Sequence, residues 1–260
     1  MGIIIGGNTI SGNFNNSGES QNTPNVVTDG LVLWLDAGNN SSYINSSNYY
    51  DCGYGCQYYS SNPGCTNCNT RWVDMSGKGN DGTIQNGTPI SYSNGSGGHF
   101  AFGASNYGIQ MTNSSSLINL KTSQGGSGLT ILIWAKSTGG TGAWRKLIGN
   151  WDGDNYIDLY QSPSGVWHQD GSGETLYVDG VNVANDSYYM PGTGWHQWGA
   201  TNSNAGTLTN PTQLLTVGNE PNLSSYPWIG DIAIVQIYNR ILTSSEMLQN
   251  FNNGRQRFGI

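Results

Sequence analysis

Basic residues are scarce in this chain. Lysine and arginine together number 9 among 260 residues, against 16 aspartates and glutamates, and the formal net charge is −7. The first 70 residues contain neither lysine nor arginine. Nucleic-acid binding depends on clustered basic side chains that neutralise phosphates, so the sequence argues against a nucleic-acid partner.

Long apolar runs are also missing. No stretch approaches the roughly 20 apolar residues that a helix needs to cross a bilayer, so we expect no membrane partner. The first ten residues, MGIIIGGNTI, have neither the basic region nor the long apolar region of a signal peptide. We therefore expect synthesis in a cytoplasm without a signal peptide.

Glycine, asparagine, serine and threonine are abundant between short apolar segments. Glycine accounts for 39 residues, aromatic residues for 11% and charged residues for only 10%. Glycine and asparagine tolerate the positive φ angles of tight turns. This composition is typical of an extracellular or particle-surface β protein, and the length suits one large domain.

Apolar segments rich in β-branched and aromatic residues recur along the chain with turn residues between them. Asp179 and Gly180 separate two such segments and predict a two-residue hairpin. The predicted fold class is all-β, a two-sheet antiparallel jelly-roll sandwich. The expected strands lie at 30–37, 129–137, 146–151, 155–161, 165–170, 175–184, 194–202, 213–219 and 228–239, with two short ones within 97–111.

One short helix is expected near the C-terminus. The segment TSSEMLQNF begins with Thr243 and has Glu246 three residues later, which is the pattern of a capping box. Met247, Leu248 and Phe251 are expected to share the face that packs on the edge of the sandwich.

Residues 1–28 are polar except for one apolar triplet, Ile3, Ile4 and Ile5. Two interpretations are open. The segment is either a flexible leader or an extended arm whose triplet anchors it to the sheet edge of a neighbouring protein. On the second interpretation, residues 29–260 form the jelly roll.

Six segments, in order, resemble a known family. They span about 30–253: GLVLWLDAGN, WVDMSGKGNDGTIQNG, GGHFAFGASNYGI, LTILIWAKS, TLYVDGVNV and IGDIAIVQIYNRILTSSEMLQNF. This order resembles concanavalin A-like lectin/glucanase domains of the laminin-G-like type. Residues 74–82 and 237–246 carry the most specific part of the resemblance. Gly103 departs from the family, which usually has an acidic residue or asparagine there.

The resemblance extends to copies of this domain in virion proteins of tailed bacteriophages, which often end in a short RFG tail, as residues 257–259 do here. It implies a jelly roll and a place on the virion surface. We therefore expect a non-enzymatic structural protein that decorates or cements the capsid or belongs to an appendage. Its arm would bind other virion proteins, and by analogy it would form a homo-oligomer such as a trimer. The alternative is a carbohydrate-binding adhesin that recognises host surface glycans.

Patterns that would indicate catalysis are missing from the sequence. Family relatives that cleave glucans carry an E-x-D-x-x-E strand, and none of the four glutamates lies in that pattern. Asp158 has no matching glutamate nearby in the sequence. The three histidines fit surface or strand positions, and no G-x-S-x-G turn accompanies them. We therefore expect that the protein is not an enzyme. The four glutamates are Glu19, Glu174, Glu220 and Glu246.

Two kinds of ligand site are nevertheless candidates. Closely spaced acidic side chains in NWDGDNYIDLY suit a hard cation such as calcium, although such residues are also ordinary in turns. Tryptophans flanked by turn residues suit a platform for a sugar ring, although each would also fit in the core. The calcium candidates are Asp152, Asp154 and Asp158, and the glycan candidates are Trp144, Trp151 and Trp228.

All four cysteines lie in a Cys/Tyr-rich insertion at about 44–71, in an early loop of the expected sandwich. Folding this stretch about YSSNPG (59–64) places Cys52 opposite Cys68 and Cys56 opposite Cys65, with one bulge residue. Two nested disulfides with this pairing are favoured, and one zinc ion bound by all four thiolates is the alternative, as are free thiols. Three disulfide connectivities remain open. No cofactor is required by the sequence.

Overall fold

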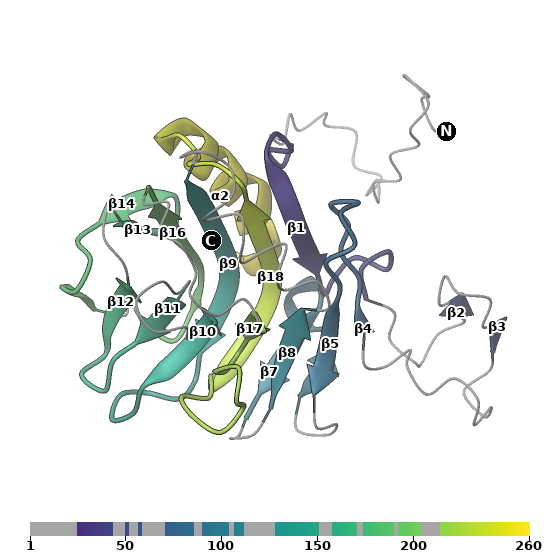
Figure 1. Ribbon diagram of the computed structural model, residues 1–260, viewed down its shortest axis with the longest axis horizontal. Coiled ribbons are helices and arrows are strands. Elements are labelled where there is room, and N and C mark those ends of the chain that lie inside the picture. The colour runs from purple at the N-terminus through teal and green to yellow at the C-terminus, as the bar shows by residue number, and fades with distance from the viewer. Residues whose placement is uncertain are drawn as a thin grey trace.

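The computed structural model describes residues 25–43, 50–51, 57–58, 71–85, 90–103, 107–111, 128–150, 158–170, 174–189, 192–203 and 214–260. Two antiparallel sheets of eight strands each make up the fold (Figure 1). Together with one C-terminal helix, they confirm the predicted all-β sandwich. No helix among the described residues is long and apolar enough to cross a membrane.

The first sheet contains the longest strands, and β1 (Leu31–Asp36) pairs with β18 at its side. The order of the other strands is β14 (Val181–Val183), β13 (Glu174–Val178), β16 (Trp195–Asn202), β9 (Leu129–Ser137), β18 (Gly230–Tyr238), β7 (His99–Phe102) and β6 (Ser91–Ser93).

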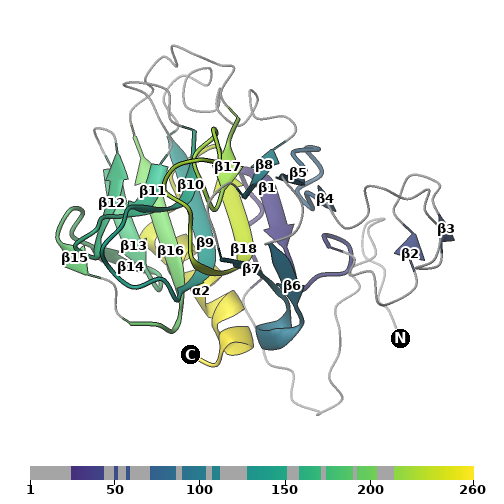
Figure 2. The ribbon, with the colours of Figure 1, turned by 90° about the horizontal axis from the view of Figure 1, so that it is seen from below.

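The second sheet is built from shorter strands. Its order is β15 (Tyr188–Tyr189), β12 (Val166–Asp170), β11 (Asp158–Gln161), β10 (Arg145–Gly149), β17 (Thr216–Val217), β8 (Gly108–Met111), β5 (Gly82–Gln85) and β4 (Arg71–Trp72). In Figure 2, seen from below, the strands of one sheet overlap those of the other, because the two sheets are stacked face to face.

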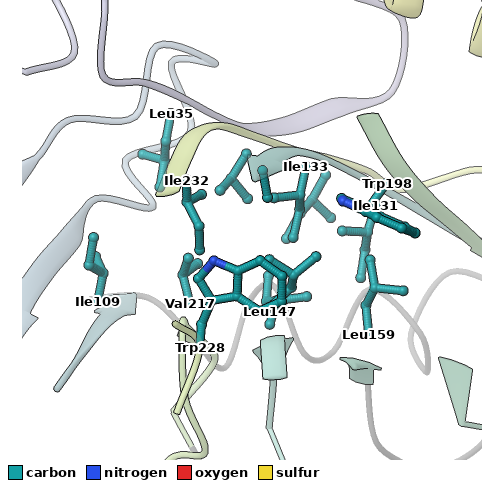
Figure 3. Packing of buried hydrophobic residues seen from close by; sticks show 14 of the residues in the cluster. Leu35, Ile109, Ile131, Ile133, Leu147, Leu159, Trp198, Val217, Trp228 and Ile232 are labelled. Atoms are coloured by element: carbon teal, nitrogen blue, oxygen red, sulfur yellow. The ribbon is translucent and has the colours of Figure 1, made fainter. Parts of the chain in front are cut away.

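The core lies between the two sheets and is formed by alternate residues of the facing strands. Leu147, Leu159 and Trp167 point into it from the second sheet. The rings of Trp167 and Trp198 stack with their centroids 3.6 Å apart. Figure 3 shows Trp228 packed in the same core. Burial of these large side chains provides most of the favourable free energy of folding.

Helix α2 (Ser244–Phe258) packs on the first sheet, on the face away from the core. The capping box between Thr243 and Glu246 is confirmed. The helix is longer than predicted. Met247 and Phe251 pack on the sheet as predicted, but Leu248 was wrong, because it is 46% exposed. The buried residues of the helix are Met247, Asn250, Gly254 and Phe258.

The stretch 74–82, which carries much of the family resemblance, holds the loop before β5 against β1. The carboxylate of Asp74 accepts hydrogen bonds from the backbone N–H groups of Trp34 (2.9 Å), Ser76 (2.9 Å) and Asn80 (3.0 Å). The Asn80 side chain donates to the carbonyl of Val32 at 2.7 Å. Asp74 and Asn80 therefore have a structural role, because their side chains form the hydrogen bonds that backbone groups of β1 and of this loop need.

Only two short strands of the Cys/Tyr-rich insertion are described. β2 (Tyr50–Asp51) and β3 (Gln57–Tyr58) pair Tyr50 with Tyr58 and Asp51 with Gln57. This register differs from the hairpin about YSSNPG that the cysteine spacing predicted, because these strands turn back earlier in the chain. The cysteines Cys52, Cys56, Cys65 and Cys68 lie outside the described residues, so both the disulfide pairing and the zinc alternative stay predictions.

Candidate functional site

Three adjacent strands of the second sheet present polar and aromatic side chains on the face away from the core. The antiparallel register pairs Lys146 of β10 with Tyr160 of β11, and Tyr160 with His168 of β12. Successive side chains of a strand point to opposite faces. Leu147, Leu159 and Trp167, their neighbours in sequence, point into the core. Lys146, Tyr160 and His168 therefore lie together on the outer face.

Four rings meet on this face, and we call Trp144, Tyr160, His168 and Tyr226 the aromatic cluster. The ring centroid of Trp144 lies 5.5 Å from that of Tyr160, 6.1 Å from that of His168 and 6.3 Å from that of Tyr226. The rings of Tyr160 and His168 stack at 5.2 Å. Trp144 is 41% exposed and Tyr226 is 37% exposed, so the cluster offers ring faces to solvent.

One edge of the aromatic cluster carries a charged side chain. Nδ1 of His168 lies 2.5 Å from Oδ1 of Asp186, which follows the β13–β14 hairpin in the sequence. Asp186 is itself largely exposed. A bound ligand would therefore meet a carboxylate at this edge.

Beside the aromatic cluster lies a buried group of charges, which we call the Lys146 triad: Lys146, Asp158 and Glu220. Nζ of Lys146 contacts both Oδ2 of Asp158 and Oε1 of Glu220. The three side chains are only 3%, 1% and 4% exposed, in that order. Nζ also lies 5.9 Å from the ring centroid of Tyr160 and 6.0 Å from that of Tyr226. One ammonium facing two carboxylates gives the triad a formal charge of −1.

The backbone around the triad is fitted to it. A Cβ atom on Gly149 would lie 2.2 Å from Oδ1 of Asp158 and 2.4 Å from Cδ of Lys146, so no larger residue fits there. The N–H of Asn150 donates to Oδ1 of Asp158 at 3.2 Å. On the other side, the N–H of Lys146 donates to the carbonyl of Tyr226 at 2.9 Å, which holds the Glu220 loop against β10.

The glycan candidates have different outcomes. Trp144 lies in the aromatic cluster, at an exposed position of the kind that the sequence predicted. Trp228 was wrong as a candidate, because its side chain is fully buried between the sheets next to Trp167. Its flanking serine and proline residues suggested a loop tip, but the loop turns the indole into the core. Trp151 lies outside the described residues.

The calcium prediction fails for Asp158, whose carboxylate is paired with the ammonium of Lys146. A cation beside that ammonium would be repelled. Asp152 and Asp154 lie outside the described residues, as do Ile3, Ile4 and Ile5 of the arm. Within the part of the chain that the structure describes, no group of three or more histidine, cysteine, aspartate and glutamate side chains is placed to hold a metal ion.

Sequence reasoning missed the role of Glu220. Asp158 was expected to have no matching glutamate, yet Glu220 lies across Lys146 from it. Glu220 is 74 residues from Lys146 in the chain and follows β17, which pairs with β10. No local spacing could have revealed this contact, because it depends on the order of strands in the sheet.

No protein-family model and no curated protein sequence matches the chain. Among solved structures, its fold is similar to that of a mutant of Trypanosoma rangeli sialidase displaying trans-sialidase activity, with a TM-score of 0.54 and 14% sequence identity. The match covers 89% of this chain and 34% of the sialidase chain, so this chain spans about a third of that protein's length. At such low identity the similarity establishes a shared sandwich fold.

Two further structures are similar at lower scores. One is domain 4 of AbnA, a GH43 extracellular arabinanase from Geobacillus stearothermophilus, in complex with arabinotriose: the TM-score is 0.44 and the identity 15%, over 85% of this chain and 97% of that one. The other is the CBM40 of a Ruminococcus gnavus IT-sialidase: the TM-score is 0.40 and the identity 13%, over 58% of this chain and 94% of that one. Both TM-scores are too low to establish a shared fold.

The comparison with the sialidase contradicts the prediction that this protein is not an enzyme. That prediction took a lectin-like sandwich without the E-x-D-x-x-E strand to exclude activity. The same fold is part of a sialidase mutant that displays trans-sialidase activity, and a fold is compatible with many functions. The missing strand pattern therefore excludes one known arrangement of carboxylates and does not exclude catalysis.

Proposed function

We propose that this protein binds glycans through the aromatic cluster. The observation that carries the proposal is the meeting of four rings on one sheet face, with Trp144 and Tyr226 exposed. An exposed group of aromatic side chains is unusual on a soluble surface unless it binds something. The flat faces of Trp and Tyr suit the apolar C–H faces of sugar rings, and their polar edges suit the hydroxyl groups.

The charges around the cluster favour neutral glycans over carboxylated ones. The adjacent Lys146 triad has a formal charge of −1, and Asp186 adds a carboxylate at the edge. Lys146 is buried, and the guanidinium of Arg145 is turned to the carbonyls of Gly139 and Gly140. An anionic sugar would therefore meet the exposed carboxylate of Asp186 and the negative net charge of the buried triad, without an exposed cation from β10 to offset them.

The test is retention on immobilised polysaccharides by affinity electrophoresis, with neutral and carboxylated polymers compared at equal ionic strength. We expect Trp144→Ala and Tyr226→Ala each to weaken binding to a neutral polymer about tenfold, the equivalent of about 1.4 kcal/mol. Leu248→Ala is the control, because Leu248 is an exposed apolar residue on α2, which covers the other sheet. Sugar release is measured in the same samples, since the fold occurs in a sialidase.

Two results would contradict the proposal. One is a wild-type protein that no polysaccharide retains. The other is retention that Trp144→Ala and Tyr226→Ala leave unchanged, because the glycan would then bind elsewhere.

We further propose that the glycans belong to a host cell surface and that the protein acts on the surface of a tailed-phage virion. The support is the sequence resemblance of residues 30–253 and the RFG tail. Residues 1–28 would attach it to other virion proteins, in a homo-oligomer such as a trimer. Purified virions are examined by mass spectrometry and antibody-gold labelling, and absence of the protein from them contradicts this setting.

A further inference from the structure

The Lys146 triad places a primary amine against two carboxyl groups in a site shielded from water. Lys146 and Asp158 come from the neighbouring strands β10 and β11, and Glu220 comes from the loop after β17. Nζ of Lys146 contacts a carboxylate oxygen of each partner. A buried ion pair has a large desolvation cost that the attraction of the charges offsets only in part. Condensation of the amine with one carboxyl group would remove two of the three buried charges, and the N–H of the new amide would face the remaining carboxylate.

We propose that Lys146 and Asp158 form an intramolecular isopeptide bond, with Glu220 as the proton carrier. Lys146 first gives one proton to Asp158. The neutral amine then attacks Cγ of Asp158, and the new Nζ–Cγ bond forms. Glu220 takes a second proton from the nitrogen and passes it to the leaving oxygen, the Cγ–Oδ2 bond breaks, and water departs. An amide replaces the ion pair, Glu220 ends as it began, and no oxidant or other reactant is needed.

The hydrogen bonds assign the two carboxyl groups to different roles. Oδ2 of Asp158 faces the amine, while Oδ1 accepts the N–H of Asn150 at 3.2 Å. That N–H stabilises the negative charge that develops on Oδ1 when the amine attacks Cγ. Among the described residues, Oε2 of Glu220 has no hydrogen-bond partner, so Glu220 keeps a free lone pair to accept a proton. Asp158 is therefore the group that becomes the amide.

The surroundings favour the bond once it forms. The contact holds amine and carboxyl group together before reaction, which replaces an encounter between separate molecules by one within the chain. The side chains are almost fully buried, so the departing water has little access for the reverse reaction. Gly149 makes the close approach possible, since a Cβ there would overlap both reacting side chains.

Intact mass spectrometry of the purified full-length chain, after reduction and alkylation of its cysteines, tests the proposal. We expect a mass lower than that of the sequence by one water molecule. Trypsin should not cut after Lys146, so residues 146–240 should stay one peptide. A loop closed between residues 146 and 158 should suppress the fragment ions between these two positions. A chain of unmodified mass that trypsin cuts after Lys146 overturns the proposal, and the triad is then an ion-pair network alone.

Variants assign the reacting groups. Lys146→Arg and Glu220→Gln should each have the mass of its own sequence, with no loss of water. Circular dichroism checks that both variants fold. Lys136→Arg is the matched control, because Lys136 pairs with Asp231 at 2.9 Å on the first sheet, and it should keep the water loss. A water loss that persists in Lys146→Arg would indicate a cyclised Asp-Gly step and overturn the proposal. A link from Lys146 to Glu220 would overturn the choice of Asp158, and a bond that still forms in Glu220→Gln would overturn the role of Glu220.

Discussion

At the scale of single residues, Glu246 connects the start of α2 to the chain before it. Its carboxylate accepts two hydrogen bonds from the guanidinium of Arg240, at 2.9 and 2.6 Å, and one from the N–H of Thr243 at 2.8 Å. The hydrogen bonds from Arg240 are the main cause that lowers the pKa of Glu246 from 4.5 to about 2, against an opposing effect of burial. Glu246 is thus held in its charged form at the helix N-terminus, where a negative charge is favourable.

Because the folded protein lowers this pKa, the unfolded state binds the proton more tightly. The stabilisation by Glu246 is therefore fully present above pH 4.5 and is lost as the pH falls toward about 2. We expect Glu246→Gln to lower the free energy of unfolding by about 1 kcal/mol at neutral pH. Glutamine can still complete the capping box, but it lacks the negative charge that pairs with Arg240 at the helix N-terminus. Urea unfolding at a series of pH values should show wild type and variant converging over that acidic interval.

Ser245→Ala is the control for this experiment, since Ser245 is an exposed residue of the same first turn. Its free energy of unfolding should follow that of the wild type at every pH. A difference between wild type and Glu246→Gln that stays constant down to pH 2 would show that Glu246 acts through packing and not through its charge.

At the scale of elements, Gly254 allows α2 to lie close against the first sheet. A Cβ on this residue would lie 2.6 Å from Nε1 and 2.7 Å from Cε2 of Trp134. The same indole stacks on Phe258 with ring centroids 4.5 Å apart. The missing side chain therefore brings the helix backbone into contact with the ring, and the helix covers the outer face of β9.

We expect Gly254→Ala to destabilise the protein by about 1–2 kcal/mol. Alanine gains about 1 kcal/mol of helix propensity over glycine, but overpacking costs about 1–3 kcal/mol, and contacts of 2.6–2.8 Å with a buried ring place this site in the upper part of that range. Gln256→Ala, at an exposed position of the same helix, should cause no loss. Thermal unfolding followed by circular dichroism measures both variants. A Gly254→Ala protein as stable as the wild type would mean that the helix does not pack this closely.

The elements differ in how far the sequence predicted them. The strand at 129–137 matches β9 residue for residue, because an apolar, β-branched run between glycines has few other solutions. The hairpin at Asp179 and Gly180 is also confirmed, and both residues have positive φ angles. The packed face of α2 was predicted only in part, because two of its buried members, Asn250 and Gly254, are not apolar. Asn250 is buried there to hydrogen-bond the N–H of Val27 and the hydroxyl of Tyr238.

At the scale of the whole molecule, the two sheets use their outer faces differently. Helix α2 covers the outer face of the first sheet, while the outer face of the second sheet carries the aromatic cluster and the Lys146 triad. The sequence predicted the strands that carry Lys146 and Asp158, and it named Trp144. It could not show that these residues meet Glu220 and Tyr226, because that contact depends on where the loop after β17 lies on the sheet. It also could not tell the buried Trp228 from the exposed Trp144, since both are flanked by turn residues.

The Cys/Tyr-rich insertion leaves and rejoins the sandwich at one place. On either side of it, the N–H of Val73 donates to the carbonyl of Ser42 at 2.7 Å, and the hydroxyl of Ser42 donates to the carbonyl of Val73 at 2.6 Å. Tyr43 packs in the main core before the insertion, and Trp72 packs in it afterwards. The two ends of the insertion are thus held together by the sandwich itself, whatever links its cysteines.

We therefore expect that replacing residues 44–70 by a short glycine-serine linker leaves the sandwich folded. Shortening a loop lowers its closure entropy by about 0.6 kcal/mol for each halving of its length, so the free energy of unfolding should hold or rise slightly. Urea unfolding with tryptophan fluorescence measures this, since Trp72, Trp167 and Trp198 report on the core. The same deletion with Ser42→Ala is the comparison, because it removes a hydrogen bond that closes the junction and should be less stable. Loss of a cooperative transition in the deletion alone would show that the insertion is part of the core and not an addition to it.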